Sequence, residues 1–207
     1  MQKESMQIPG MVGSSVAFAS VEIVSCGLGK GKHGWNVSLA NYESIYVLVN
    51  IEAIIYCLIM FTAKYAVLQL IKSIFYDHRR KKVVVRVIWG LIWANLLLYS
   101  LVILLIIFGC KPIKKQWSPA TPGHCINQAD LYIPSGALNI LSDLTILAVP
   151  LAAISKLQAP IKTKIAAGSL FSIGVFACMA SIARLSYSLK LDLYDATWLL
   201  LPVNQWA

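Results

Sequence analysis

The sequence has few charged residues, and acidic residues are the scarcest of them. Of its 207 residues, 13% are charged and 58% are hydrophobic, with 9 aspartates and glutamates against 18 lysines and arginines. A soluble domain of this size has about a quarter of its residues charged. The scarcity of charge excludes an ordinary soluble domain and indicates an integral membrane protein.

The sequence also lacks the motifs of soluble catalysis. It has no Ser-His-Asp set, and the glycine-rich stretch GLGKGKH lacks the Gly-Lys-Ser/Thr ending of a phosphate-binding loop. His33 and His124 lie outside any CxxC or HxxxH spacing that would hold zinc. We therefore expect no metal, no cofactor and no active site of the soluble type.

The excess of positive charge, formally +9, does not indicate a nucleic-acid-binding protein. The basic residues flank the apolar runs, whereas a nucleic-acid-binding domain would carry them as a stripe on one face. Basic flanks of this kind set the orientation of a membrane protein and contact anionic lipid head groups. The expected partner is therefore the lipid bilayer, and no nucleic acid is expected.

Long apolar runs predict complete membrane spans, because about 20 apolar residues cross a bilayer as a helix. The four complete spans are expected at about 44–74, 83–108, 134–154 and 165–186. The apolar stretches 11–24 and 198–207 are too short to cross and are interpreted as partial spans. The predicted fold class is all-α, a multi-pass transmembrane helix bundle that forms a single membrane domain over residues 1–207. We also expect the chain to be a fragment or a shortened gene product.

The loops between the spans differ in basic residues and so predict the orientation. Nine basic residues flank the first and third connections, which are therefore expected to be cytoplasmic. The loop 109–133 is then extracellular or lumenal, in the plasma membrane or an endomembrane, although it carries three lysines. A cytoplasmic partner is expected to contact the basic group of the first connection, which consists of Arg79, Arg80, Lys81 and Lys82.

Cysteine positions support the same orientation. Cys26, Cys110 and Cys125 lie on the outer side, where disulfides persist. Cys57 and Cys178 lie within spans, where a free cysteine is usually a small buried apolar residue. A Cys110–Cys125 disulfide is the favoured pairing, and the alternative is that one of these two pairs with Cys26 and leaves the other free.

Ionisable side chains inside the spans are the candidate functional residues, because burying a charge in lipid is costly and usually serves a function. Glu52 and Asp143 are expected at depths of about 12 Å and about 14 Å, at 1.5 Å per helical residue, so the two carboxylates could meet. Lys64 is expected to extend to the inner membrane surface. Arg184 is expected to reach head groups or to pair with an acid of a neighbouring helix.

Asp143 shares a polar helix face with Asn139, one turn earlier, and with Ser142. Such a face must point at other helices or at a water-filled pocket. Two interpretations are open, interhelical hydrogen bonding and a ligand, ion or proton site. The residues that could form such a site in the bundle are Glu52, Asn139, Ser142, Asp143 and Arg184.

Several stretches occur in an order that points to one family. They are GLGKGKHGWNV, LIMFTAKYAVLQLIKSIFY, CKPIKKQW…GHC, NILSDLTILAVPL, SIGVFACMASIARL and DLYDATW. Together they resemble the fungal rhodopsin-like domain, a family of seven-helix membrane proteins that includes receptor-like surface proteins of filamentous fungi. The resemblance covers residues 20 to 206 and implies an amino terminus on the outer side.

On the seven-helix plan, 11–24 would end the second helix, the complete spans would be helices three to six, and 198–207 would begin the seventh. Retinal is not implied, because its Schiff-base lysine belongs deep in a seventh helix. Asn36 departs from the family, which often has an acid there. It also begins an NVS glycosylation sequon on the outer side, close enough to the membrane for low occupancy.

The resemblance implies a receptor-like protein, without enzymatic activity, that senses an unknown small-molecule ligand. A second hypothesis is a membrane-embedded, cyclase-like enzyme of a secondary-metabolite pathway, with Glu52 and Asp143 as acid and base on an apolar substrate. A third hypothesis is a proton-coupled transporter in which the same two acids carry protons.

Overall fold

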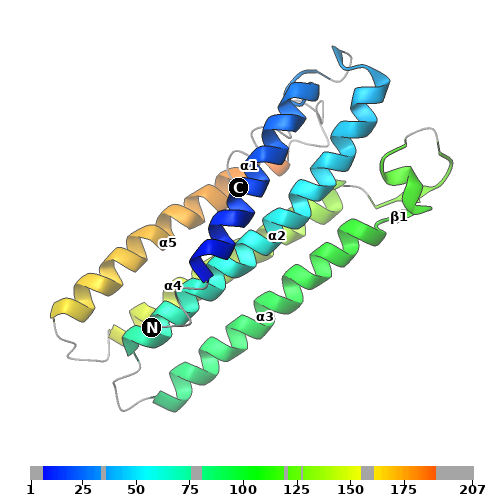
Figure 1. Ribbon diagram of the computed structural model, residues 1–207. Coiled ribbons are helices and arrows are strands. Elements are labelled where there is room, and N and C mark those ends of the chain that lie inside the picture. The colour runs from blue at the N-terminus through cyan, green and yellow to red at the C-terminus, as the bar shows by residue number, and fades with distance from the viewer. Residues whose placement is uncertain are drawn as a thin grey trace.

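Five long α-helices run side by side along one axis in the computed structural model of the chain (Figure 1). The structure describes residues 7–33, 36–75, 81–118, 121–126, 128–154 and 161–189. The helices are α1 (Gln7–Leu28), α2 (Leu39–Phe75), α3 (Lys81–Phe108), α4 (Gln128–Ile154) and α5 (Ile161–Ser188). The basic residues Arg79 and Arg80 and the predicted partial span at 198–207 lie outside the described residues.

A short hairpin connects α3 to α4. Strand β1 (Cys110–Lys111) pairs antiparallel with β2 (His124–Cys125), and the 3₁₀ helix η2 (Ile113–Gln116) lies between them. We call the end of the bundle that carries this hairpin the hairpin end. Because α2 and α3 are antiparallel, the turn from α1 to α2 lies at the hairpin end as well (Figure 1).

Four of the helices are long and apolar enough to cross a membrane, which confirms the four predicted complete spans. Their apolar segments are Asn41–Ser73, Val83–Phe108, Asp130–Val149 and Phe171–Ser188. The stretch 11–24 belongs to α1, whose apolar part Val12–Leu28 is shorter than a span. The predicted fold class, an all-α multi-pass bundle, is confirmed.

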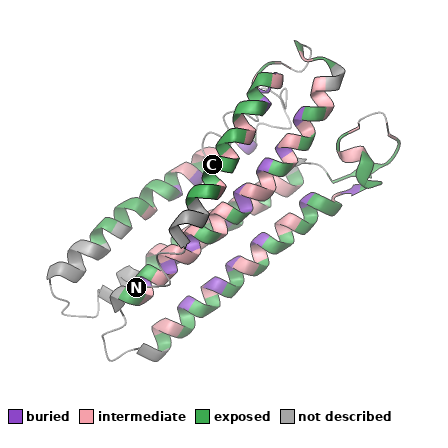
Figure 2. Ribbon diagram, viewed as in Figure 1, coloured by how far each residue is buried: buried purple, intermediate pink, exposed green. Residues whose placement is uncertain are grey.

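The outward faces of the helices are apolar and exposed, as Figure 2 shows in green along the rims of the bundle. Leu97 on α3 is 68% exposed and Phe176 on α5 is 69% exposed. In water such a surface would be unstable, whereas in a bilayer it lies against hydrocarbon. The faces that point inward carry both apolar side chains and buried polar ones such as Glu52 and Lys64.

The buried apolar side chains form three separate layers along the bundle. Ile45 and Val49 lie nearest the hairpin end, Cys57 and Tyr99 belong to the middle layer, and Leu68 packs in the layer furthest from the hairpin. Buried polar residues of α2, Glu52 and Lys64, fall between these layers. The bundle therefore alternates apolar packing with polar contacts along its length.

Two glycines allow α4 and α5 to approach each other closely. A Cβ added to Gly174 on α5 would lie 2.2 Å from Leu147 of α4, and a Cβ added to Gly136 on α4 would lie 3.1 Å from Leu185 of α5. Each helix thus offers a glycine to a leucine of the other. Small residues at such contacts are typical of helix pairs in membranes.

Candidate functional site

A buried ion pair links α2 to α4 in the interior of the bundle. Lys64 Nζ lies 3.0 Å from Asp143 Oδ1, and the two side chains are 7% and 12% exposed. Lys64 also donates a hydrogen bond of 3.2 Å to the backbone oxygen of Asn139 and lies 5.7 Å from the ring centroid of Tyr99. The ammonium group is therefore held by a carboxylate, a carbonyl and an aromatic face.

The prediction that Lys64 extends to the membrane surface is wrong. Lys64 lies eleven residues before the end of α2 at Phe75. That length of helix spans about 16 Å, which exceeds the reach of a lysine side chain. Pairing with Asp143 in the bundle replaces the contact with water that a lysine near the helix end would make.

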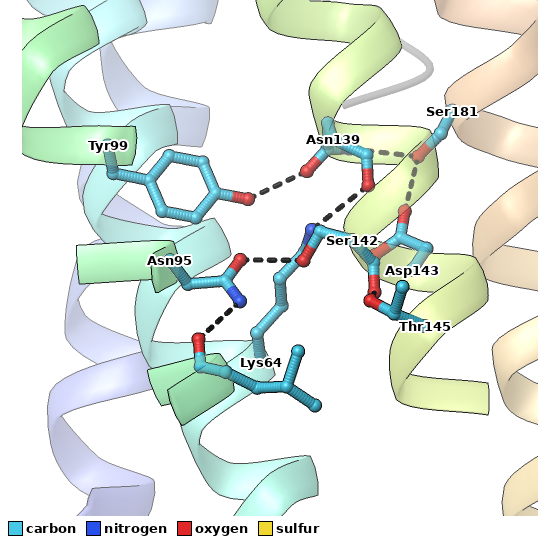
Figure 3. A network of polar contacts seen from close by, with 9 residues as sticks. Lys64, Asn95, Tyr99, Asn139, Ser142, Asp143, Thr145 and Ser181 are labelled. Carbon is cyan, nitrogen blue, oxygen red and sulfur yellow. Dashed lines mark hydrogen bonds and ion pairs between the residues drawn. The ribbon is translucent and has the colours of Figure 1, made fainter. Parts of the chain in front are cut away.

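Hydrogen bonds extend from this ion pair to α3 and α5 (Figure 3). The Tyr99 hydroxyl of α3 donates to Asn139 Oδ1 at 2.7 Å. The Asn139 amide donates to Ser181 Oγ of α5 at 3.1 Å, and the Ser181 hydroxyl donates to Asp143 Oδ2 at 3.1 Å. One continuous set of contacts thus joins α2, α3, α4 and α5.

A second connection to α3 lies beside it. The Ser142 hydroxyl donates to Asn95 Oδ1 at 2.7 Å, and the Asn95 amide donates to the Leu91 carbonyl at 2.8 Å. The predicted polar face of Asn139, Ser142 and Asp143 therefore makes interhelical hydrogen bonds. We call the whole set the polar network, and its members are Lys64, Asn95, Tyr99, Asn139, Ser142, Asp143 and Ser181.

A different buried cluster ties α1 to α2 near the hairpin end. Lys30 Nζ lies 2.7 Å from Glu22 Oε2 and 2.5 Å from Glu52 Oε2. The Ser25 hydroxyl donates to Glu52 Oε1 at 2.6 Å. Lys30, Ser25 and Glu52 are all buried. We call Glu22, Ser25, Lys30 and Glu52 the Lys30 cluster.

The backbone of the α1–α2 turn places Lys30 in this cluster. Gly29 and Gly31 have φ values of 115° and 89°, in the left-handed region that glycine adopts readily. The Lys30 amide donates to the Ser25 carbonyl at 3.1 Å, which closes the end of α1 and directs the lysine back toward the helices. The motif GLGKGKH therefore builds a turn that presents a buried cation, a role that its sequence alone did not reveal.

Glu52 and Asp143 do not form the predicted pair. Glu52 binds Lys30, whereas Asp143 binds Lys64, which lies twelve residues later on α2 and about 18 Å further along its axis. The prediction counted depth from the expected starts of the two spans, 44 and 134. It failed because Lys64 and Asp143, which meet, each lie eleven residues before the end of their helix, whereas α2 has 37 residues and α4 has 27. The start of α2 therefore extends about ten residues beyond the level at which α4 begins.

Arg184 on α5 forms no ion pair with an acid among the described residues, and its contact with head groups stays a prediction. Its guanidinium lies 3.8 Å from the ring centroid of Tyr56, and its buried Nε has no hydrogen-bond partner among the described residues. The side chain lines a cavity of about 30 Å³ between α2, α3, α4 and α5, together with Tyr56, Tyr99, Tyr132 and Asn139. We call this space the arginine cavity.

A larger cavity of about 260 Å³ lies beneath the hairpin. Aromatic side chains and two amides contribute much of its lining, namely Tyr42, Tyr46, Trp117, Tyr132, Asn50 and Gln116. Ile106 and Tyr132 line both this hairpin cavity and the arginine cavity. The two spaces are therefore neighbours, separated by shared walls.

The hairpin is fixed to the bundle above its cavity. Cys110 and Cys125 form the predicted disulfide, and Cys26 is free and exposed, so the alternative pairing is wrong. The Gln116 amide donates to Asn50 Oδ1 at 2.7 Å and to the Ile106 carbonyl at 2.6 Å. These bonds hold the loop against α2 and α3.

Two other predicted positions have simple surroundings. Asn36 of the glycosylation sequon is exposed in the α1–α2 turn at the hairpin end. Among the described residues, no group of three or more His, Cys, Asp or Glu side chains is arranged to hold a metal ion.

Apolar spans around a buried polar interior define a multi-pass α-helical membrane protein. The sequence matches the fungal rhodopsin domain over residues 6–207. The chain belongs to this family, as its motifs predicted.

Two curated relatives show sequence similarity. A SAT4 family membrane protein of Emericella nidulans is 33% identical over 174 residues, which cover 84% of this chain and 45% of the relative. Fugralins biosynthesis cluster protein 2 of Gibberella zeae is 28% identical over 100 residues, which cover 47% of this chain and 25% of that protein. The chain thus spans less than half the length of either relative. No solved structure matches the chain.

Proposed function

We propose that this membrane protein of the fungal rhodopsin family senses a small molecule, without retinal, and that the molecule binds in the hairpin cavity. The observation that carries the proposal is the cavity itself, about 260 Å³ in volume under a disulfide-closed loop. Small-molecule sites are typically concave, largely apolar and close to this size or larger, from about 300 Å³ upward.

The lining of the hairpin cavity suits a small molecule with an apolar body. Tyr42 and Tyr46 have ring centroids 4.6 Å apart, and their hydroxyls are joined by a hydrogen bond of 2.9 Å. They offer aromatic surface that is already held in place. Trp117 of the hairpin and Tyr132 of α4 add further aromatic walls. Asn50 and Gln116 supply the few polar groups that orient a ligand in such sites.

The hairpin also supports the proposal because it is held in position before any ligand arrives. The disulfide and the Gln116 bonds to Asn50 and Ile106 anchor it at two points. A site that is already ordered loses less conformational entropy on binding. The 109–133 loop would face the extracellular or lumenal side, and a cytoplasmic partner would contact the basic group Arg79, Arg80, Lys81 and Lys82 of the connection between the first two complete spans.

A second candidate function, an enzyme of a secondary-metabolite pathway, is favoured by the name of one relative, the fugralins biosynthesis cluster protein. In this chain an acid–base pair of Glu52 and Asp143 finds no support, because each carboxylate binds its own lysine. An enzyme or a proton carrier would have to use Lys64 and Asp143. If Asp143→Asn leaves both the metabolite profile and proton-coupled uptake unchanged, both of these alternatives fail.

The proposed function is tested by ligand titration of the purified protein in detergent micelles. The probes are octanoate, 4-phenylbutanoate and geranate, each with its neutral primary amide, at free concentrations set by equilibrium dialysis. We expect at least one carbon skeleton to change the tryptophan emission in a saturable manner. The change should be absent in Trp117→Phe.

The matched control is Trp93→Phe, because Trp93 is 57% exposed on the outer face of α3, away from the hairpin cavity. This variant should keep the saturable emission change. The proposal is wrong if no probe gives a saturable signal, or if the signal is the same in both variants.

A further inference from the structure

Among the described residues, Arg184 is the one strongly basic side chain that lines the arginine cavity, whereas Lys115 of the hairpin lines the hairpin cavity. Each lysine buried in the described bundle has a carboxylate, Lys30 through Glu22 and Glu52 and Lys64 through Asp143. Within the described ranges, Arg184 has no carboxylate and contacts the ring of Tyr56 instead. A cation inside a membrane without a counter-charge is costly, so such residues usually mark a binding site.

Arg184 has an unused hydrogen-bond donor and lines a cavity. Its Nε is buried and has no acceptor in the described part of the chain. The arginine cavity that it lines has a volume of about 30 Å³. That is room for roughly two water molecules, or for the two oxygens of one carboxylate.

Three other polar side chains of the arginine cavity already have partners. The Asn139 side chain accepts from Tyr99 and donates to Ser181. The Ser135 hydroxyl donates to the Tyr132 carbonyl at 3.0 Å. Arg184 Nε therefore remains a buried donor without an acceptor in the described part of the chain. The acceptor that suits a guanidinium best is a planar carboxylate, which can bind through two hydrogen bonds.

The position of the arginine cavity fixes what the rest of the ligand must be. Ile106 and Tyr132 separate it from the hairpin cavity, and both residues line both spaces. A molecule that passes between them would place one end at Arg184 and the other against Tyr42, Tyr46 and Trp117. That second end should be mainly apolar, because the wall it meets is mostly aromatic and aliphatic apart from Asn50, Lys115 and Gln116.

We propose that the ligand is a small apolar carboxylic acid whose carboxylate binds Arg184 and whose hydrocarbon body fills the hairpin cavity. This inference rests on the proposed function and names the chemical class of ligand. The Arg184 guanidinium would make the site prefer the acid over its neutral amide, whereas the hairpin cavity would bind the apolar body of either compound. The two contributions can therefore be separated by experiment.

The test compares each acid with its neutral amide, which has nearly the same shape, in the titration described above. In the unmodified protein the acid should bind more tightly by about tenfold or more, as expected for hydrogen bonds that involve charged groups. In Arg184→Gln the acid should lose this advantage while the amide binds as before. In Arg184→Lys the preference for the acid should be partly retained, because the charge remains.

Binding of the amide serves as the internal control for folding. If the Arg184→Gln variant still binds the amide, its hairpin cavity is intact. If the Arg184→Gln variant does not fold, the Arg184→Lys variant tests the inference instead. Loss of all preference for the acid in that variant would contradict a site based on charge. Arg86→Gln, at the opposite end of α3, should change neither affinity. Equal binding of acid and amide to the unmodified protein overturns this inference and leaves the proposed function standing. Absence of binding by all probes overturns both.

Discussion

The two lysines that are buried among the described residues differ in how their charges are balanced. Lys30 comes from a turn, lies between two left-handed glycines and binds two glutamates. Lys64 comes from the middle of a long helix and binds a single aspartate. The formal charge is therefore −1 among Glu22, Lys30 and Glu52, and zero in the Lys64–Asp143 pair.

The difference lies in the number of carboxylates that balance each lysine, two for Lys30 and one for Lys64. If one carboxylate of the Lys30 cluster is lost, Lys30 still has another carboxylate. Loss of either member of the Lys64–Asp143 pair leaves a buried charge whose remaining partners are neutral. The Lys30 cluster connects two helices near one end, whereas the polar network connects four helices in the interior. Substitutions should therefore cost more in the polar network.

The largest effect is expected from Lys64→Met. It leaves Asp143 buried without a cation and should lower the free energy of unfolding by about 3–5 kcal/mol. Unfolding is measured by titration with sodium dodecyl sulfate in mixed micelles, followed by circular dichroism. The double variant Lys64→Met/Asp143→Asn removes both charges and should recover most of the loss. Additive losses in the double variant would contradict the ion pair.

A smaller effect is expected from Glu52→Gln. Lys30 keeps Glu22, and the cluster becomes neutral, so the loss should be close to that of one charged hydrogen bond, about 1.5 kcal/mol. The same titration measures it. Lys30→Met is the matched comparison and should cost more, because it leaves two glutamates side by side without the cation. The redundancy argument fails if Glu52→Gln destabilises the protein as much as Lys64→Met does.

The smallest effects are expected from two serines, each of which makes hydrogen bonds within one of the two clusters. Ser181→Ala removes interhelical hydrogen bonds to Asn139 and Asp143, whereas Ser25→Ala removes one interhelical bond to Glu52 and one bond to the Val21 carbonyl within α1. A side-chain hydrogen bond between membrane helices contributes about 0.6 kcal/mol on average. Ser181→Ala should therefore cost about twice as much as Ser25→Ala, and the reverse order would show that the polar network is not the stronger connection.

The spans and the disulfide could be predicted from the sequence because their signals are local. Apolar runs of sufficient length fix the helices, and Cys110 and Cys125 close a loop between two of them. The sequence also indicated that Asp143 and Asn139 face other helices. Each of these conclusions needs only the residues within one segment, so no knowledge of the packing was required.

The partners of the buried charges could not be predicted, because they depend on how far the helices are shifted along one another. Lys64 was expected at the surface, and Glu52 was expected near Asp143. Lys30 was missed because a lysine in a glycine-rich turn is usually solvated. Its available signal was the presence of Glu22 in α1, which has no lysine or arginine, and of Glu52 in α2, whose first lysine lies twelve residues later. Tyr99 and Ser181 are neutral, and nothing in their local sequence distinguishes them from other polar residues.

The two glycine contacts between α4 and α5 have a mechanical consequence. Leu185 of α5 packs on Gly136 of α4, and Leu147 of α4 packs on Gly174 of α5. On each helix the glycine and the leucine lie eleven residues apart, which is about 16 Å along the axis. A pair of helices joined at two such points cannot slide without withdrawing both leucines at once. If α5 moves when a ligand binds Arg184, α4 should therefore move with it as one rigid pair.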